Sequence, residues 1–191
     1  MTKVTLLRHG QTDYNAKGLL QGRIDNQLNA TGLLQAQRAA EAIGPVDQII
    51  SSPLKRAIQT AKAFNVDTQI DENWIELNYG EWDGMPLQAI KKETWNKWKT
   101  DSSFKPPKGE SLEELGKRVR LSLNNIEKNT DQHLLIVTHV SPIKAALAWA
   151  LDVNDSIAWK TRLETASFTQ INIDSDTPVL TKFNHTAENR D

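Results

Sequence analysis

Three short strand candidates, separated by segments of helical character, most strongly constrain the fold of this chain. The candidates are "VTLL" (4–7), "VDQII" (46–50) and "HLLIVTH" (133–139). Short apolar strands that alternate with helices are typical of largely parallel sheets, which helices cover on both faces. We therefore expect an α/β fold, a three-layer α/β/α sandwich around a mostly parallel central sheet.

The segments between these strands have helical periodicity and recognisable helix starts. In "SLEELGKRVRLSLNNIEKN" (111–129), Ser111 and Glu114 have the spacing of a capping box, and apolar residues recur every three or four positions. Ser52 suits an N-cap and Pro53 the first helical position, and "SPIKAALAWAL" (141–151) repeats this start. The other expected elements are a helix over 31–44 that Gly44 ends, a strand over 167–173 and an edge strand over 178–184.

The composition excludes several classes of function. The chain has 191 residues, with 23 basic and 24 acidic side chains, so its overall charge predicts no affinity for nucleic acid or membranes. It has no cysteine, and no two of its four histidines have metal-ligand spacing, so we expect no disulfide, no thiolate chemistry, no metal and no cofactor. The length of the chain predicts a single domain over residues 1–191. No apolar run has the length of a signal peptide or a membrane span, so we expect a cytoplasmic protein. The oligomeric state stays open.

Polar side chains follow each of the three strand candidates at its carboxyl end. Arg8 and His9 follow the first, Arg56 follows the second and His139 follows the third. Because ligands of such sheets bind beyond the carboxyl ends of the strands, we expect these side chains to meet at one edge of the sheet.

This combination of residues suits the transfer of a phosphoryl group. Two guanidinium groups can bind a phosphoryl group through paired hydrogen bonds. A neutral imidazole can attack phosphorus, and a second imidazole can donate to a phosphoryl oxygen as charge develops. Because the arginines supply the compensating charge, such a site needs no metal.

Six stretches, in order along the chain, resemble motifs of the histidine phosphatase superfamily, which includes the cofactor-dependent phosphoglycerate mutases. "LLRHGQTDYN" is similar to the R-H-G-x-T-x-x-N signature, and "LQGRIDNQLNATGLLQA" to the segment that follows it in the phosphatase members. "SSPLKRAIQTA" and "ELNYGEWDG" resemble the next two motifs, and "GES" and "VTH" complete the series. The resemblance covers about residues 4 to 145 and implies a phosphoglycerate mutase-like fold.

The resemblance also implies a role for each matching residue. His9 would be the nucleophile that becomes phosphohistidine, and Glu76 the acid that protonates the leaving oxygen and then activates water. Arg8, Arg56 and His139 would form the phosphate pocket. The expected substrate-binding residues are Thr12, Asn15 and Arg23.

Two positions leave alternatives open. Asp71, Glu72 and Glu81 lie close to Glu76 in sequence and compete with it for the role of acid. Many members have glycine directly after the second histidine, whereas this chain has Val140, so its backbone there lacks the freedom of glycine. Ser141 or Lys144 would then help to shape the substrate pocket.

Segment 85–108 lies where the family places a variable cap over the site. It contains six lysines together with Trp95 and Trp98. One hypothesis is an aromatic, cationic mouth for a phosphorylated metabolite, and the other is an amphipathic helix with its tryptophans inward and its lysines in water.

The sequence therefore predicts a phosphomonoesterase that hydrolyses a small phosphorylated metabolite through phosphohistidine. One alternative is a phosphoglycerate mutase-type phosphoryl transferase, although true mutases of this family are usually longer. Another is an inactive module that binds phosphorylated ligands. The sequence does not distinguish sugar phosphates, phosphoglycerates, nucleotides, ribazole phosphate or phosphoproteins as substrates.

Overall fold

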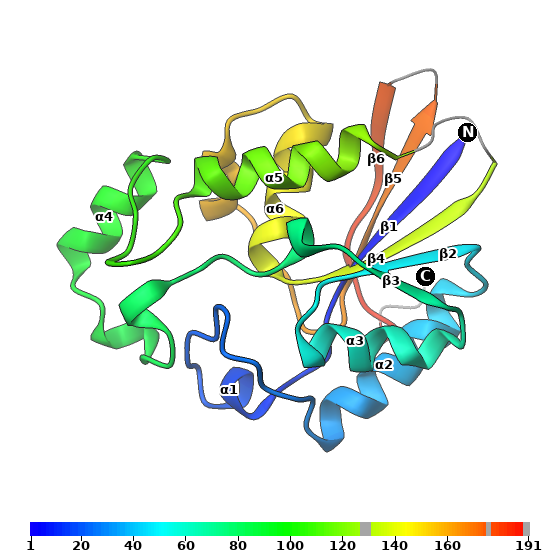
Figure 1. Cartoon of the computed structure of the whole chain (residues 1–191), viewed down its shortest axis with the longest axis horizontal. Helices are drawn as coiled ribbons and strands as arrows, with labels where there is room; N and C mark the ends of the chain where they lie inside the picture. Colours follow the sequence, from blue (N-terminus) through cyan, green and yellow to red (C-terminus); the bar gives the residue numbers. More distant parts are fainter. Residues whose placement is uncertain (127–130, 175–176, 189–191) are drawn as a thin grey trace.

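The strand candidates pair side by side in one mixed sheet. The computed structural model describes residues 1–126, 131–174 and 177–188. Within these residues the sheet has six strands in the order β3-β2-β4-β1-β5-β6 (Figure 1). The strands are β1 (Thr2–Arg8), β2 (Gln48–Ser51), β3 (Thr68–Ile70), β4 (His133–Thr138), β5 (Phe168–Asp174) and β6 (Thr177–His185). Four neighbouring strands, β3, β2, β4 and β1, are parallel to one another. Strand β5 pairs antiparallel with β1, and β6 pairs antiparallel with β5.

Helices cover both faces of this sheet, which confirms the expected α/β fold. Leu6 and Leu7 are adjacent in β1 and therefore point to opposite faces. Leu6 packs in the cluster that contains residues of α5 and α6, and Leu7 in the cluster that contains residues of α2 and α3. Figure 1 shows these two helix pairs on opposite sides of the sheet. The α-helices are α1 (Asp13–Ala16), α2 (Ala30–Ile43), α3 (Lys55–Ala61), α4 (Lys92–Thr100), α5 (Leu112–Asn124) and α6 (Val140–Ala150).

Short 3₁₀ segments occupy several of the connections between these elements. They are η1 (Lys62–Phe64), η2 (Glu72–Trp74), η3 (Gly80–Trp82), η4 (Leu87–Ala89) and η5 (Asp155–Trp159).

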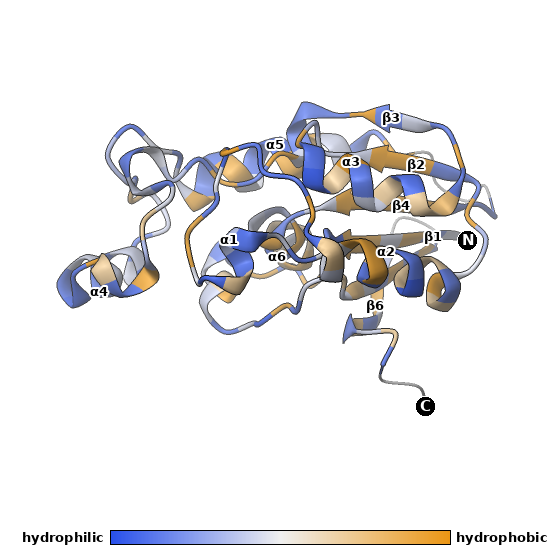
Figure 2. Cartoon of the chain, turned by 90° about the horizontal axis from the view of Figure 1, so that it is seen from below, coloured by the Kyte–Doolittle hydropathy of each residue, from blue (hydrophilic) through white to orange (hydrophobic). Residues whose placement is uncertain are grey.

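Figure 2 shows that α2 and α3 mix hydrophobic and hydrophilic residues, as helices that cover a sheet on one side do.

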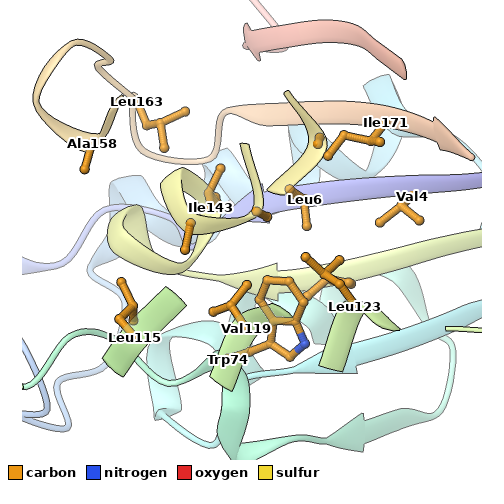
Figure 3. Close-up of a cluster of buried hydrophobic side chains, with 14 of the residues drawn as sticks. Val4, Leu6, Trp74, Leu115, Val119, Leu123, Ile143, Ala158, Leu163 and Ile171 are labelled. Carbon is orange, nitrogen blue, oxygen red and sulfur yellow. The ribbon is translucent and has the colours of Figure 1, made fainter. Parts of the chain in front are cut away.

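The larger hydrophobic cluster fixes α5 and η2 against the sheet. Trp74 is fully buried, and it lies between Leu6 of β1 and Val119 and Leu123 of α5 (Figure 3). Its indole Nε1 donates to Ser122 Oγ at 2.8 Å, so burial of this large side chain leaves no polar atom unpaired. The residues directly after Trp74, which include Glu76, are therefore held at a defined place beside the sheet.

Several helix starts were predicted correctly and two were wrong. Ser111 caps α5 and forms the expected capping box with Glu114. Helix α3 begins at Lys55 rather than at Pro53, and α6 begins at Val140 rather than after Ser141. The Ser52 hydroxyl oxygen accepts the backbone N–H of Leu54 at 3.3 Å, just before α3, and it also lies 2.7 Å from His139 Nε2. The end of the helix expected over 111–129 lies outside the described residues.

Segment 85–108 projects from the sheet beyond α5 and contains η4 and α4 (Figure 1). Trp98 of α4 is buried at the centre of an aromatic cluster. Its ring lies 5.4 Å from the rings of Trp95 and Trp82 and 5.0 Å from that of Trp159 in η5. Such aromatic contacts attach α4 to the rest of the chain. No helix in the described ranges is long and apolar enough to cross a membrane.

Candidate active site

The carboxyl ends of β1 and β4 place the two expected catalytic histidines beside each other. His9 directly follows β1, and its backbone N–H donates to the Thr138 carbonyl at the end of β4 at 2.9 Å. His139 follows Thr138, and the two imidazole rings lie 5.1 Å apart. Both side chains are buried. The prediction that these strand ends meet at one edge of the sheet is therefore confirmed.

One nitrogen of His9 is held in the form that a nucleophile requires. Nδ1 lies 2.7 Å from the carbonyl oxygen of Gly10. Because a carbonyl only accepts, Nδ1 carries the proton and Nε2 has a free electron pair. Burial, together with the positive charges of Arg56 and Arg8, lowers the pKa of His9 well below its usual range, so the ring is neutral near pH 7.

Arg56 lies between the two histidines. Its Nε–H points to His9 Nε2 and His139 Nδ1, each at 3.2 Å. Its Nη1 and Nη2 donate to the carbonyls of Ile24 and Gly22, both at 2.8 Å. Burial lowers the pKa of Arg56 to about 10, so the guanidinium stays charged at neutral pH.

The contacts of His139 also define its protonation. Since the Arg56 guanidinium only donates, Nδ1 of His139 accepts, and in the neutral ring Nε2 donates to Ser52 Oγ at 2.7 Å. Burial, Arg56, His9 and Arg8 together lower the pKa of His139 well below its usual range. In this state the nitrogen that faces His9 carries no proton.

Arg8 retains donors that its neighbours do not use. Its Nη1 donates to the Leu163 carbonyl at 2.6 Å, which fixes the direction of the side chain. Its Nε is buried and has no hydrogen-bond partner among the described residues. A buried donor without a partner is costly, and a phosphoryl oxygen would satisfy it.

Glu76 is the one acidic candidate of its segment that the structure brings into the site. Its side chain is buried, and Oε1 accepts the backbone N–H groups of Leu77 at 2.8 Å and Ser141 at 3.1 Å. Because Ser141 lies in the first turn of α6, the carboxylate also faces the positive end of that helix. Of the alternatives, Asp71 bonds to Asn73 and Ser122, Glu72 is exposed, and Glu81 pairs with Lys108 on the surface.

A cavity of about 590 Å³ opens beside these groups. Arg8, His9, Arg56 and Glu76 line one part of it, and His139 lies behind Arg56. The opposite part is lined by Trp95 and Trp98 of the expected cap and by Trp159 of η5. The structure supports elements of both hypotheses for segment 85–108. Trp98 is buried in the aromatic cluster, as expected of an amphipathic helix with its tryptophans inward. It also forms part of the cavity wall, as expected of an aromatic mouth.

The three expected substrate-binding residues have different positions. Asn15 lines the cavity, whereas Thr12 is buried beneath it and caps α1. Arg23 lies outside the cavity lining. It pairs with Glu110 at 3.3 Å and donates to the main-chain carbonyl of Glu76 at 3.5 Å. These contacts support the segment around Glu76, and a role of Arg23 in substrate binding stays a prediction.

The comparison with known families agrees with this geometry. A profile described as "Histidine phosphatase superfamily (branch 1)" matches residues 4–186, nearly the whole chain. The chain belongs to this superfamily. The family and the phosphoglycerate mutase-like fold expected from the sequence are both confirmed.

The relatives of the chain include proteins that are named as phosphatases. A putative phosphoserine phosphatase 2 of Hydrogenobacter thermophilus is 31% identical over 200 residues, which cover 100% of this chain and 98% of the relative. A bifunctional protein of Mycobacterium tuberculosis is 34% identical over 177 residues, which cover 87% of this chain. The match spans only 49% of that relative, so the chain corresponds to about half of the mycobacterial protein.

A solved structure confirms the fold of the chain. Phosphoserine phosphatase from Entamoeba histolytica, crystallised with 3-phosphoglyceric acid, superposes with a TM-score of 0.89 at 30% identity. The superposition covers 97% of this chain and 98% of that protein.

Val140 does not disturb the backbone after the second histidine. It is the first residue of α6 and has no positive φ angle, so the position does not require glycine. Its side chain lines the cavity, as do Ser141 and Lys144. The expectation that these two residues shape the pocket agrees with their placement.

Sequence reasoning missed several residues that line the cavity. Tyr79 lines the cavity, lies 3.4 Å from Ser141 through its hydroxyl, and has a raised pKa because it is buried. It stands within the quoted motif "ELNYGEWDG", which was the available signal. Residues 162–165 line the cavity from the loop before β5, and nothing in their sequence pointed to the site.

In the part of the chain that the structure describes, no group of three His, Asp or Glu side chains could hold a metal ion. Metal independence stays a prediction, and Arg8 and Arg56 supply positive charge beside His9.

Proposed function

We propose that this chain is a phosphomonoesterase that hydrolyses a small phosphorylated metabolite through a phosphohistidine at His9. The observation that carries the proposal is the state of His9, which is buried, neutral and hydrogen-bonded through Nδ1 to Gly10. Its Nε2 electron pair is therefore directed toward the guanidinium of Arg56, where a phosphoryl group would bind.

In the first step, Nε2 of His9 forms a bond to phosphorus as the bond to the ester oxygen breaks. Arg8 and Arg56 bind the equatorial oxygens, on which negative charge is spread in the transition state. Glu76, when it holds a proton, gives it to the leaving oxygen, so the product is a neutral alcohol.

In the second step, water attacks the phosphorus of the phosphohistidine. Glu76 has lost its proton and takes one from this water, the bond between nitrogen and phosphorus breaks, and inorganic phosphate leaves. His9 regains its free electron pair and Glu76 its proton. The chain's own residues therefore complete the cycle without a metal.

The arrangement of the chain supports three subsidiary proposals. We propose that residues 1–191 act as one catalytic domain with segment 85–108 as its cap. We propose a substrate small enough for the cavity of about 590 Å³, with no nucleic acid or membrane as partner. We keep the cytoplasm as the proposed location, on the composition of the chain alone.

Rapid quenching with ³²P-labelled substrate tests the nucleophile. Wild-type protein should retain label that survives base and is lost in acid, as a phosphoramidate behaves. His9→Ala should retain none and turn over negligibly, whereas His185→Ala, on a histidine outside the cavity lining, should behave like the wild type. Acid-stable label, or a His9→Ala protein with near-normal turnover, would contradict the assignment.

The same experiment separates a phosphatase from a mutase. A phosphatase releases most of the label as inorganic phosphate, whereas a mutase transfers it to a second hydroxyl with little free phosphate. Binding without label transfer or phosphate release would support the inactive module instead.

A further inference from the structure

Lys144 places a positive charge in the wall of the cavity. It lies in α6 three residues after Ser141, and residues at this spacing share one face of a helix. Both side chains line the cavity. The Lys144 ammonium donates to the main-chain carbonyl of Ala158 in η5 at 2.6 Å.

This ammonium has no ion-pair partner among residues 1–126, 131–174 and 177–188. Glu76 attracts it through space and Arg8 repels it, while the Glu76 carboxylate already accepts two backbone N–H groups. Burial lowers the pKa of Lys144. A partly buried charge is costly unless a partner offsets it, and a neutral carbonyl offsets only part of that cost.

The surroundings of Lys144 would strengthen its attraction for an anion. Trp159, next to Ala158, and Trp95 and Trp98 of α4 line the same cavity. Aromatic walls exclude water, and charges interact more strongly where water is excluded. Two of the three ammonium donors remain unused by the described residues.

We propose that Lys144 determines specificity by binding a second anionic group, a carboxylate or a further phosphate, on the part of the substrate that does not react. This inference rests on the proposed function and deepens it. The reacting phosphoryl group lies between the arginines and His9, and the second anion lies toward α6 and η5. A substrate with both groups would then be oriented at two points.

Matched substrates test the proposal through a ratio of kcat/KM values. One pair is 3-phosphoglycerate and glycerol 3-phosphate, which differ by a carboxylate. The other is fructose 1,6-bisphosphate and fructose 6-phosphate, which differ by a phosphate. The wild type should prefer the second anion in at least one pair, and the pair that shows the preference identifies the anion.

Two substitutions separate charge from structural support. Lys144→Met removes the charge and the hydrogen bond to Ala158, whereas Lys144→Gln removes the charge but keeps a donor for that carbonyl. Both should lower the preference about 10- to 100-fold, the usual effect of losing a charged hydrogen bond. Lys160→Met, on an exposed lysine just after η5, should leave the preference unchanged.

Several results would overturn the inference while the proposed function stands. One is a wild type that releases phosphate with no preference in either pair. Another is an equal loss of activity on all substrates in Lys144→Met while Lys144→Gln keeps wild-type activity. That result would make Lys144 a structural support for η5. If no substrate is hydrolysed, the proposed function fails. Ligand binding, measured by tryptophan fluorescence, then still tests whether Lys144 binds the second anion. In His9→Ala protein, 3-phosphoglycerate or fructose 1,6-bisphosphate should bind at least tenfold more tightly than its partner lacking the anion, and Lys144→Gln should abolish that difference.

Discussion

Replacing Glu76 with glutamine should slow phosphorylation of the enzyme according to how much the leaving group needs a proton. The side chain accepts N–H groups from Leu77 and Ser141 through Oε1 alone. Glutamine has the same size and keeps an amide oxygen for both contacts, so the backbone around the site stays in place. It cannot supply a proton.

The size of the effect follows from the chemistry of the leaving oxygen. A general acid contributes about 10²- to 10⁴-fold where the leaving group requires protonation. An alkoxide leaves poorly without a proton, so the single-turnover burst with an alkyl phosphate should slow by about that factor. A nitrophenolate leaves well without one, so the burst with p-nitrophenyl phosphate should slow only a few fold.

Rapid-quench measurement of this burst is the appropriate assay, because in the proposed mechanism Glu76 also activates water in the second step and would affect the steady state. Glu81→Gln is the matched control, since Glu81 is exposed and pairs with Lys108 at 2.9 Å. It should behave like the wild type with both substrates. Equal losses of burst rate for the two substrates would show that Glu76 positions the site without donating the proton.

Three other predictions concern protons and metals. Phosphate bound at Arg8, Arg56 and His9 should raise the pKa of the neighbouring His139, because a nearby anion favours the charged imidazole. Binding should then take up a proton, so the calorimetric enthalpy should change with the ionisation enthalpy of the buffer. No such change would refute the coupling. The half-buried His133 has a lowered pKa in the folded state, so the folded chain binds fewer protons than the unfolded chain. The free energy of unfolding should therefore fall as the pH drops below about 6.5, and His133 should contribute at most about 1.4 kcal/mol per pH unit to this slope. In urea unfolding at several pH values, His133→Asn should remove that contribution. A slope with pH that the substitution leaves unchanged would contradict the prediction. Chelator should leave phosphate release intact, and activity that requires added Mg²⁺ or Zn²⁺ would argue for metal-assisted hydrolysis.

Local patterns predicted those parts of the fold that local interactions decide. The capping box of Ser111 and Glu114 was predicted correctly because both of its hydrogen bonds join residues three positions apart. The meeting of His9 and His139 followed from a general property of parallel sheets rather than from any contact between them. Strand β3 (Thr68–Ile70) was not predicted, since it has three residues and two of them are exposed.

Distant contacts decided the features that the sequence alone did not settle. Ser52 and Ser141 both resemble N-caps, yet the Ser52 hydroxyl bonds to His139 and the Ser141 backbone bonds to Glu76. The choice of Glu76 over its acidic neighbours depends on that same Ser141 N–H, 65 residues further along the chain. Glu76 and Ser141 are too far apart in sequence for a local pattern to link them. Four carboxylates therefore remained candidates, and only the folded structure identified the one that lies beside α6.

The hydrogen bonds around the backbone of His9 have a consequence for hydrogen exchange. The His9 N–H donates to Thr138 and the His9 carbonyl accepts from Ala166, so the end of β1 is tied to β4 and to the lead into β5. Its amide should exchange with solvent only when the whole sheet unfolds. Helix α4 is attached mainly through tryptophan rings, and its amides should exchange through smaller, more frequent openings. His9, the proposed nucleophile, would then stay in register with its neighbours while the wall of the cavity opens around it.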